Sequence, residues 1–145
     1  MKMINMTRKL DIGCGDSSTK LATVEDDVTW LGIDIDNYRD QEGGPDILAD
    51  AERLPFKDKM FDEIWSGACI GVYTDEQGFA EAVRVMKSGS RYVTRVFVKH
   101  IPETIAWMLA RDLTVSNIES LNWDDDKTLS EVIITAYKAA QVSGL

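Results

Sequence analysis

Short apolar runs alternate with segments of helical pattern along this chain, and this order limits the folds that are open to it. Alternating strands and helices are typical of a layered α/β domain with a mainly parallel sheet. In such a sheet, ligands bind at the carboxyl ends of the strands. The first apolar runs end in acidic residues, serine or glycine, so we expect the functional residues at those ends. The predicted strands in this part of the chain are 8–12, 29–35, 46–49 and 61–66.

The second half of the chain continues the pattern. The stretch 74–77 has the spacing of a capping box, apolar residues at helical intervals follow it through Met86, and Ser88-Gly89 predicts a left-handed helix end. The other predicted elements are a helix at 17–24, a strand at 91–98, a helix at 102–111 and strands at 113–123 and 130–138. The last two strands predict an antiparallel hairpin, which brings the sheet to seven strands.

Length and charge restrict the classes of function. With 145 residues and no linker or repeat, we expect one domain over 1–145. The net charge is −9, and no basic cluster is visible, so nucleic acid is not an expected partner.

The compartment follows from cysteine usage and hydropathy. Two cysteines are too few for a disulfide framework, the first six residues do not resemble a signal peptide, and no run approaches the roughly 18 apolar residues of a membrane span. We expect a cytoplasmic protein without a membrane partner.

The turn after the first strand reads LDIGCGDSS at 10–18, and two glycines stand in it. Gly13 and Gly15 remove the side chains that would keep a ligand from the backbone. A dinucleotide fingerprint would need a further glycine at position 18, where the chain has Ser18. A nicotinamide-dependent oxidoreductase is therefore disfavoured.

Four stretches together resemble class I S-adenosylmethionine-dependent methyltransferases, in particular compact members of the type 11-like group. LDIGCGDSS looks like the first motif of that family, WLGIDID is similar to its second-strand motif, and DAERLPF and EAVRVMKSGSRYV resemble two later segments. The resemblance covers roughly residues 9–98. It implies a Rossmann-like, doubly wound, mostly parallel sheet with a C-terminal antiparallel hairpin.

The resemblance also implies a binding site for S-adenosylmethionine. At the methionine part of the cofactor, it implies that Asp11 braces the glycine loop, that the loop is formed by Gly13, Cys14 and Gly15, which hold this part, and that Ser66 lies beside the amine. At the ribose, it implies that Asp34 accepts hydrogen bonds from the hydroxyls. At the adenine, it implies that Ile35 lies against the ring and that Asp50 and Ala51 bind its edge. Acidic strand ends also suit the sulfonium and ammonium charges of this cofactor. No metal and no particular catalytic residue is implied.

The implied activity is methyl transfer to a small molecule or a protein side chain. The first predicted strand begins close to the first residue, without a preceding helix, and the third glycine of the motif is replaced by Ser17. The replacement at Ser17 bears on the affinity for the cofactor. Because no helix precedes the first strand and the region between Asp36 and Asp46 is also short, we expect an open site, or one that a partner protein completes. A cofactor-binding subunit without catalysis of its own is the alternative.

Four further features have a functional and a structural interpretation. His100 follows the fifth strand and is either a general base or, as we expect, a solvated loop residue. Tyr73 either faces the acceptor or is an ordinary, partly buried aromatic residue. Cys14 is either a nucleophile or, as we expect, a small residue that the turn tolerates, and Cys69 is expected to pack. The acids at 124–126 lack the alternate spacing of a calcium loop, so we expect a solvated turn.

Overall fold

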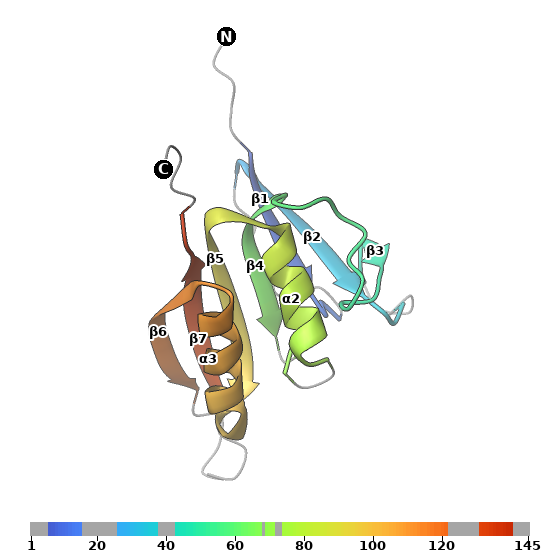
Figure 1. Cartoon of the computed structure of the whole chain (residues 1–145). Coiled ribbons are helices and arrows are strands. Elements are labelled where there is room, and N and C mark those ends of the chain that lie inside the picture. Colours follow the sequence, from blue (N-terminus) through green and yellow to red (C-terminus); the bar gives the residue numbers. More distant parts are fainter. Residues whose placement is uncertain are drawn as a thin grey trace.

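A seven-stranded sheet with the order β3-β2-β1-β4-β5-β7-β6 is the centre of the computed structural model (Figure 1). The structure describes residues 6–15, 26–37, 43–67, 69–71, 74–121 and 131–140. Its strands are β1 (Thr7–Ile12), β2 (Val28–Asp34), β3 (Ile47–Leu48), β4 (Phe61–Gly67), β5 (Met86–Phe97), β6 (Leu113–Leu121) and β7 (Glu131–Lys138).

Strand directions confirm the predicted sheet. Strands β1 to β5 pair in parallel, whereas β7 runs antiparallel to both β5 and β6. The predicted hairpin is thus present, and its second strand lies against β5. The predicted helix at 17–24 and the turn at 124–127 lie outside the described residues.

Three helical elements are described: α2 (Glu76–Val85), the short 3-10 helix η1 (Val98–His100) and α3 (Ile101–Ala110). Both α-helices cover the same face of the sheet (Figure 1). On this face Phe79 of α2 packs edge-on against Tyr92 of β5, with ring centroids 5.4 Å apart, and Trp107 of α3 lies 6.1 Å from Phe79. Among the described residues, no helix is both long and apolar enough to cross a membrane.

The junction between α2 and β5 differs from the prediction. The helix ends at Val85 and not at Ser88-Gly89, because Met86 is already extended and pairs with Phe61 of β4. Gly89 has the expected positive φ of 78°, but it lies inside β5, where the register with β4 shifts. Tertiary strand pairing thus overrides the helical periodicity at Met86.

The start of α2 and the third strand also differ in detail. Asp75, not Thr74, is the N-cap, and its side chain accepts a hydrogen bond from Gln77 N at 3.4 Å. The Gln77 side chain donates instead to the carbonyl of Glu52 at 3.3 Å, so the capping box is not formed. The third strand contains only Ile47 and Leu48 of the predicted 46–49.

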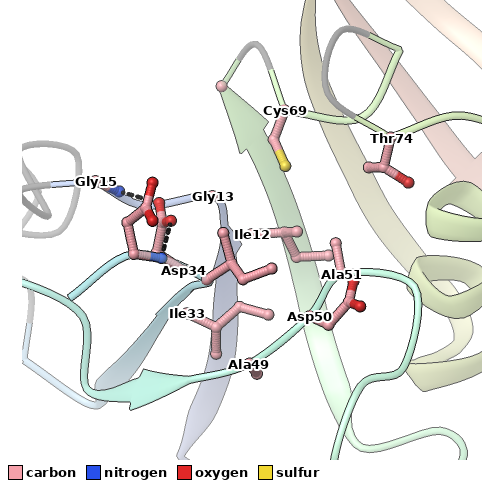
Figure 2. A pocket seen from close by; sticks show the side chains of 13 residues that line it. Ile12, Gly13, Gly15, Ile33, Asp34, Ala49, Asp50, Ala51, Cys69 and Thr74 are labelled. Atoms are coloured by element: carbon pink, nitrogen blue, oxygen red, sulfur yellow. Dashed lines mark hydrogen bonds between the residues drawn. The ribbon is translucent and has the colours of Figure 1, made fainter.

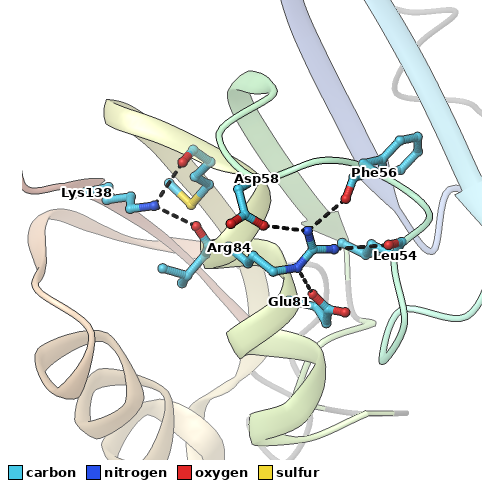
Figure 3. A network of polar contacts seen from close by, with 8 residues as sticks. Leu54, Phe56, Asp58, Glu81, Arg84 and Lys138 are labelled. Atoms are coloured by element: carbon cyan, nitrogen blue, oxygen red, sulfur yellow. Dashed lines mark hydrogen bonds and ion pairs between the residues drawn. The ribbon is translucent and has the colours of Figure 1, made fainter.

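Arg84 connects α2 to the loop that follows β3 (Figure 3). Its guanidinium donates to the carbonyls of Leu54 and Phe56 at 3.0 and 2.7 Å and to Asp58 at 2.9 Å, and it also pairs with Glu81. These contacts join two stretches that the sequence marked separately, DAERLPF and EAVRVMKSGSRYV. They hold the loop in place beside the amino ends of β4 and β5.

Candidate functional site

The turn after β1 has a backbone that favours glycine at two positions. Gly13 and Gly15 have φ angles of 70° and 54°. A Cβ on Gly13 would lie 2.5 Å from Cys69 Cβ, whereas a Cβ on Gly15 would have no atom within 4 Å. Gly13 is therefore needed for both conformation and space, while Gly15 leaves open room beside the backbone.

Asp34, the last residue of β2, holds this turn (Figure 2). Its Oδ2 accepts a hydrogen bond from Gly15 N at 3.0 Å, and its Oδ1 accepts one from Asp36 N at 3.0 Å. Among the described residues, Asp34 thus contacts the turn directly, and the bracing role that the resemblance implies for Asp11 stays a prediction. Each carboxylate oxygen can accept a second hydrogen bond, so Asp34 keeps acceptor capacity for a ligand.

A cavity of about 350 Å³ opens at the carboxyl ends of β1, β2 and β4, within the range of small-molecule sites. Figure 2 shows the side chain of Cys69 pointing toward Ile12 on one side and Asp50 and Ala51 lying on another. We call it the first cavity. Six of the residues that the resemblance implies line it: Gly13, Gly15, Asp34, Ile35, Asp50 and Ala51.

The lining of the first cavity combines acids with an apolar surface. Asp34, Asp36 and Asp50 are its carboxylates, and its described lining contains no lysine or arginine. Asp50 Oδ1 accepts a hydrogen bond from Glu52 N at 2.9 Å, which fixes the carboxylate within a turn. Ile35 is 69% exposed, so its face is free for a flat ring.

The other three implied residues lie elsewhere. Asp11, Cys14 and Ser66 line a second cavity of about 270 Å³. The two cavities share Gly13 and Gly67 in their linings, and the nine implied residues thus divide between adjoining spaces.

Asp11 and Ser66 are both buried in this second cavity. Asp11 is 4% exposed, and its burial, with a smaller contribution from the charge of Asp34, raises the pKa of its carboxyl to about 7. Ser66 is 1% exposed; its hydroxyl accepts a hydrogen bond from Ile70 N at 3.0 Å.

Several lining residues were not found from the sequence. Cys69, Thr74, Asp36 and Gly67 line the first cavity, and Arg95 lines the second. Asp36 and Gly67 directly follow predicted strands, so the rule that ligands bind at strand ends was a signal for them. The other three carry no sequence signal.

Cys69 faces the first cavity but is not a reactive thiolate. Burial, followed by the charges of three nearby aspartates, raises the pKa of its thiol to about 11. At neutral pH the group is thus a protonated thiol, in agreement with the expected packing role.

His100 lines neither cavity. It precedes α3, and its Nδ1 atom lies 4.0 Å from Glu103. The geometry therefore gives no support to a general base at this position. Tyr73 and the acids at 124–126 lie outside the described residues.

The residues of the first cavity fit a nucleoside that carries positive charge. The glycine turn leaves room that a Cβ at position 15 would enter, and Asp34 and Asp50 present acceptors to hydroxyl and amino groups. Carboxylates without a basic neighbour in the described lining also favour a cation.

Comparison with known proteins identifies a family. The model of the methyltransferase domain family matches residues 10–94 of the chain. No match is found among curated protein sequences.

Three solved structures illustrate the similarity of fold. A SAM-dependent methyltransferase from Methanosarcina mazei has a TM-score of 0.76 at 16% identity, with 94% of each chain covered. The [4+2]-cyclase SpnF has a TM-score of 0.77 at 17% identity, over 93% of this chain and 75% of the cyclase. Geranyl diphosphate C-methyltransferase from Streptomyces coelicolor, solved with S-adenosyl-L-homocysteine, has a TM-score of 0.74 at 17% identity, over 93% and 73%.

The family match covers more than half of the chain, and the strand order and the glycine turn agree with it. This protein therefore belongs to the methyltransferase domain family and has the Rossmann-like fold of class I S-adenosylmethionine-dependent methyltransferases.

Proposed function

We propose that the chain binds S-adenosylmethionine and transfers its methyl group to a small molecule or a protein side chain. The observation that carries the proposal is the first cavity, where Asp34 and Asp50 border the turn at Gly13 and Gly15. The family match and the structure of a relative with S-adenosyl-L-homocysteine bound support the choice of cofactor.

In this proposal four residues of the first cavity have a defined contact with the cofactor. Asp34 accepts hydrogen bonds from the two ribose hydroxyls with the acceptor capacity that Gly15 N and Asp36 N leave free. Ile35 supports one face of the adenine. Asp50 accepts from the adenine amino group, and the backbone amide of Ala51 donates to the ring.

The cofactor supplies a methyl group on a positively charged sulfur, which is already a good electrophile. The protein's contribution is then to align the acceptor and to exclude water, and neither task needs an acid or base of unusual pKa. This agrees with a described lining in which the one thiol, Cys69, is held protonated. We assign no catalytic residue.

The alternative is a subunit that binds the cofactor but does not transfer the methyl group, with a partner protein completing the site. The [4+2]-cyclase SpnF, with a TM-score of 0.77, has the same fold but is named for an activity other than methyl transfer, and this supports keeping the alternative.

Calorimetric titration with S-adenosylhomocysteine tests the binding site. Asp34→Ala should weaken binding by about 1.5 to 3 kcal/mol, as expected for hydrogen bonds to a charged group, while the fold stays intact. Asp26→Ala is the matched control, because it removes the same charge from an exposed turn at the other end of β2. Equal affinity in both variants would remove Asp34 from the site.

A turnover assay separates the two functions. Incubation of the protein with S-adenosylmethionine and a cell extract as acceptor should produce S-adenosylhomocysteine. Binding without turnover would favour the subunit, and absence of binding to either compound would refute both.

A further inference from the structure

The second cavity extends across the sheet and away from the glycine turn. Its lining residues include members of β1, β4, β5, β7 and β6, which are neighbours in that order. Adjacent strands are about 4.8 Å apart, so β1 and β5 are separated by about 10 Å. We call the part at β5, β7 and β6 the far half; it is lined by Val93, Thr94, Arg95, Leu121 and Ile133. The far half is a space distinct from the turn after β1.

The far half combines an apolar wall with one cation. Tyr92 of β5 packs on Phe79 of α2. Val93 and Arg95 follow Tyr92 by one and three positions, so both belong to the opposite face of the sheet. On the neighbouring β7, Ile133 pairs in register with Arg95, the only basic residue in the described lining of this cavity. Such a wall suits a molecule that has an apolar body and one anionic end.

The Arg95 guanidinium is only partly used by the described residues. Its Nε atom makes no hydrogen bond among them, and its ion pair there is with Glu131 of β7, at 3.7 Å. That separation is too long for a hydrogen bond. With 40% of the side chain exposed, the guanidinium can donate two parallel hydrogen bonds to the carboxylate of a ligand.

Gly67 connects the far half to the first cavity. It pairs in register with Arg95 and lines both cavities. Among the described residues, the nearest atom to a Cβ placed on Gly67 is Arg95 Nη2, at 4.0 Å, so the junction is open beside the guanidinium. Under the proposed function the nucleoside occupies the first cavity, and a molecule in the far half therefore approaches it at Gly67.

We propose that the methyl acceptor is a small organic carboxylate that occupies the far half. Its carboxylate binds Arg95, and its accepting nitrogen or oxygen reaches the first cavity at Gly67. Its apolar body lies on the apolar wall of the far half. This inference rests on the proposed function, and it makes Arg95 a residue that determines the specificity for the acceptor.

The transfer itself balances without a further reactant. A lone pair on the nitrogen or oxygen of the acceptor forms the new bond to the methyl carbon. The electron pair of the broken bond between carbon and sulfur stays on sulfur, and the proton of the acceptor goes to water. The carboxylate on Arg95 takes no part in these bond changes and only positions the acceptor.

The charges around Arg95 favour a carboxylate over a phosphate. Glu131 lies 3.7 Å from the guanidinium. An acid this close to the cation opposes a dianion more strongly than a monoanion. The net charge of −9 of the chain acts in the same direction. A singly charged end group is therefore the better match.

Binding is tested by calorimetry on the protein saturated with S-adenosylhomocysteine. The probes are phenylacetate and phenylpropionate, each beside its neutral amide. Each carboxylate should bind about 10- to 100-fold more tightly than its amide, the range for hydrogen bonds to charged groups. Arg95→Met should remove this preference and Arg95→Lys should restore part of it, while the affinity for S-adenosylhomocysteine stays the same in both variants.

Turnover is tested with the small-molecule fraction of a cell extract as acceptor. The wild-type protein should form S-adenosylhomocysteine from S-adenosylmethionine with this fraction. Conversion of its carboxylates to methylamides should slow the reaction by at least about tenfold, and Arg95→Met should slow it equally with the untreated fraction.

Arg91→Met is the matched control. Arg91 lies on the same strand and face as Arg95, is held by Glu63 at 2.6 Å, and lines neither cavity. Its replacement should leave the preference for the carboxylate probes and the turnover unchanged, and circular dichroism of each variant reports whether it is folded.

The outcomes distinguish this inference from the proposed function. If the wild-type protein does not bind S-adenosylhomocysteine, the proposed function fails. If it binds this compound but binds carboxylates and amides equally, or turns over the treated and untreated fractions equally, the carboxylate acceptor is refuted while the nucleoside site stands. Weaker binding of S-adenosylhomocysteine in Arg95→Met would place the guanidinium on the cofactor and would also refute the inference.

Discussion

Replacement of Asp11 by asparagine should change how the stability of the ligand-free protein depends on pH. Asp11 is 4% exposed, and burial and the charge of Asp34 raise the pKa of its carboxyl from an ordinary 3.8 to about 7. Between these two values the native state keeps the Asp11 proton that the unfolded state has released. The native state then binds more protons, so the free energy of unfolding falls as the pH rises.

The size of the effect follows from the shift. A difference of about three pKa units corresponds to about 4 kcal/mol. The corresponding loss in the free energy of unfolding is absent below about pH 4, grows as the pH rises, and is complete above about pH 7. Asp11→Asn has nearly the same shape and no titrating group, so it should not lose this stability.

Urea unfolding at pH values from about 4 to about 8 measures the effect as a difference between the two proteins. The wild-type protein should lose about 4 kcal/mol relative to Asp11→Asn over this range. The other carboxylates titrate alike in both proteins, so their contribution to the pH dependence is absent from the difference between the two free energies of unfolding. Asp26→Asn, at an exposed position, should follow the wild-type curve. A difference that stays constant with pH, or one that grows in favour of the wild-type protein, would refute a raised pKa at Asp11.

Two further predictions concern the stability of the fold. Gly13→Ala should lower the free energy of unfolding by more than Gly15→Ala, because only the first substitution places a Cβ 2.5 Å from Cys69 Cβ. Gly15→Ala should lower it by about 1 to 2 kcal/mol, because alanine is strained in the left-handed backbone at this position. Equal losses in denaturant unfolding would contradict the packing argument. Arg84→Met should cost about 2 to 3 kcal/mol, since it leaves two backbone carbonyls without their donor. Lys87→Met, which breaks one partly exposed ion pair at 2.9 Å, should cost less than about 1 kcal/mol in the same assay, and a similar loss in both variants would count against the Arg84 network.

The elements that depend on local pattern could be predicted from the sequence. The strand predicted at 8–12 is found at Thr7–Ile12, and the helix predicted at 102–111 is found at Ile101–Ala110. Apolar spacing and an opening proline are properties of neighbouring residues, and they need no knowledge of the rest of the chain. The positive φ angles of Gly13 and Gly15 belong to the same class.

Features that depend on distant pairing could not be predicted in this way. Met86 fits the helical period of α2, yet it joins β5 because Phe61 of β4 is its partner. The place of β7 between β5 and β6 also follows from pairing, since either strand of a hairpin can lie against the sheet. Strand pairing is decided between segments far apart in the sequence, where local periodicity carries no information.

By itself, the sequence determined the α/β alternation, the glycine turn and the acids at the strand ends, because each is written in a few adjacent residues. Only the tertiary structure decided that Asp34 holds the turn and that Arg95 shares a cavity with Asp11. Hydrogen bonds and cavities join side chains from different strands, and their positions are set by the register of the sheet and not by the order of the residues.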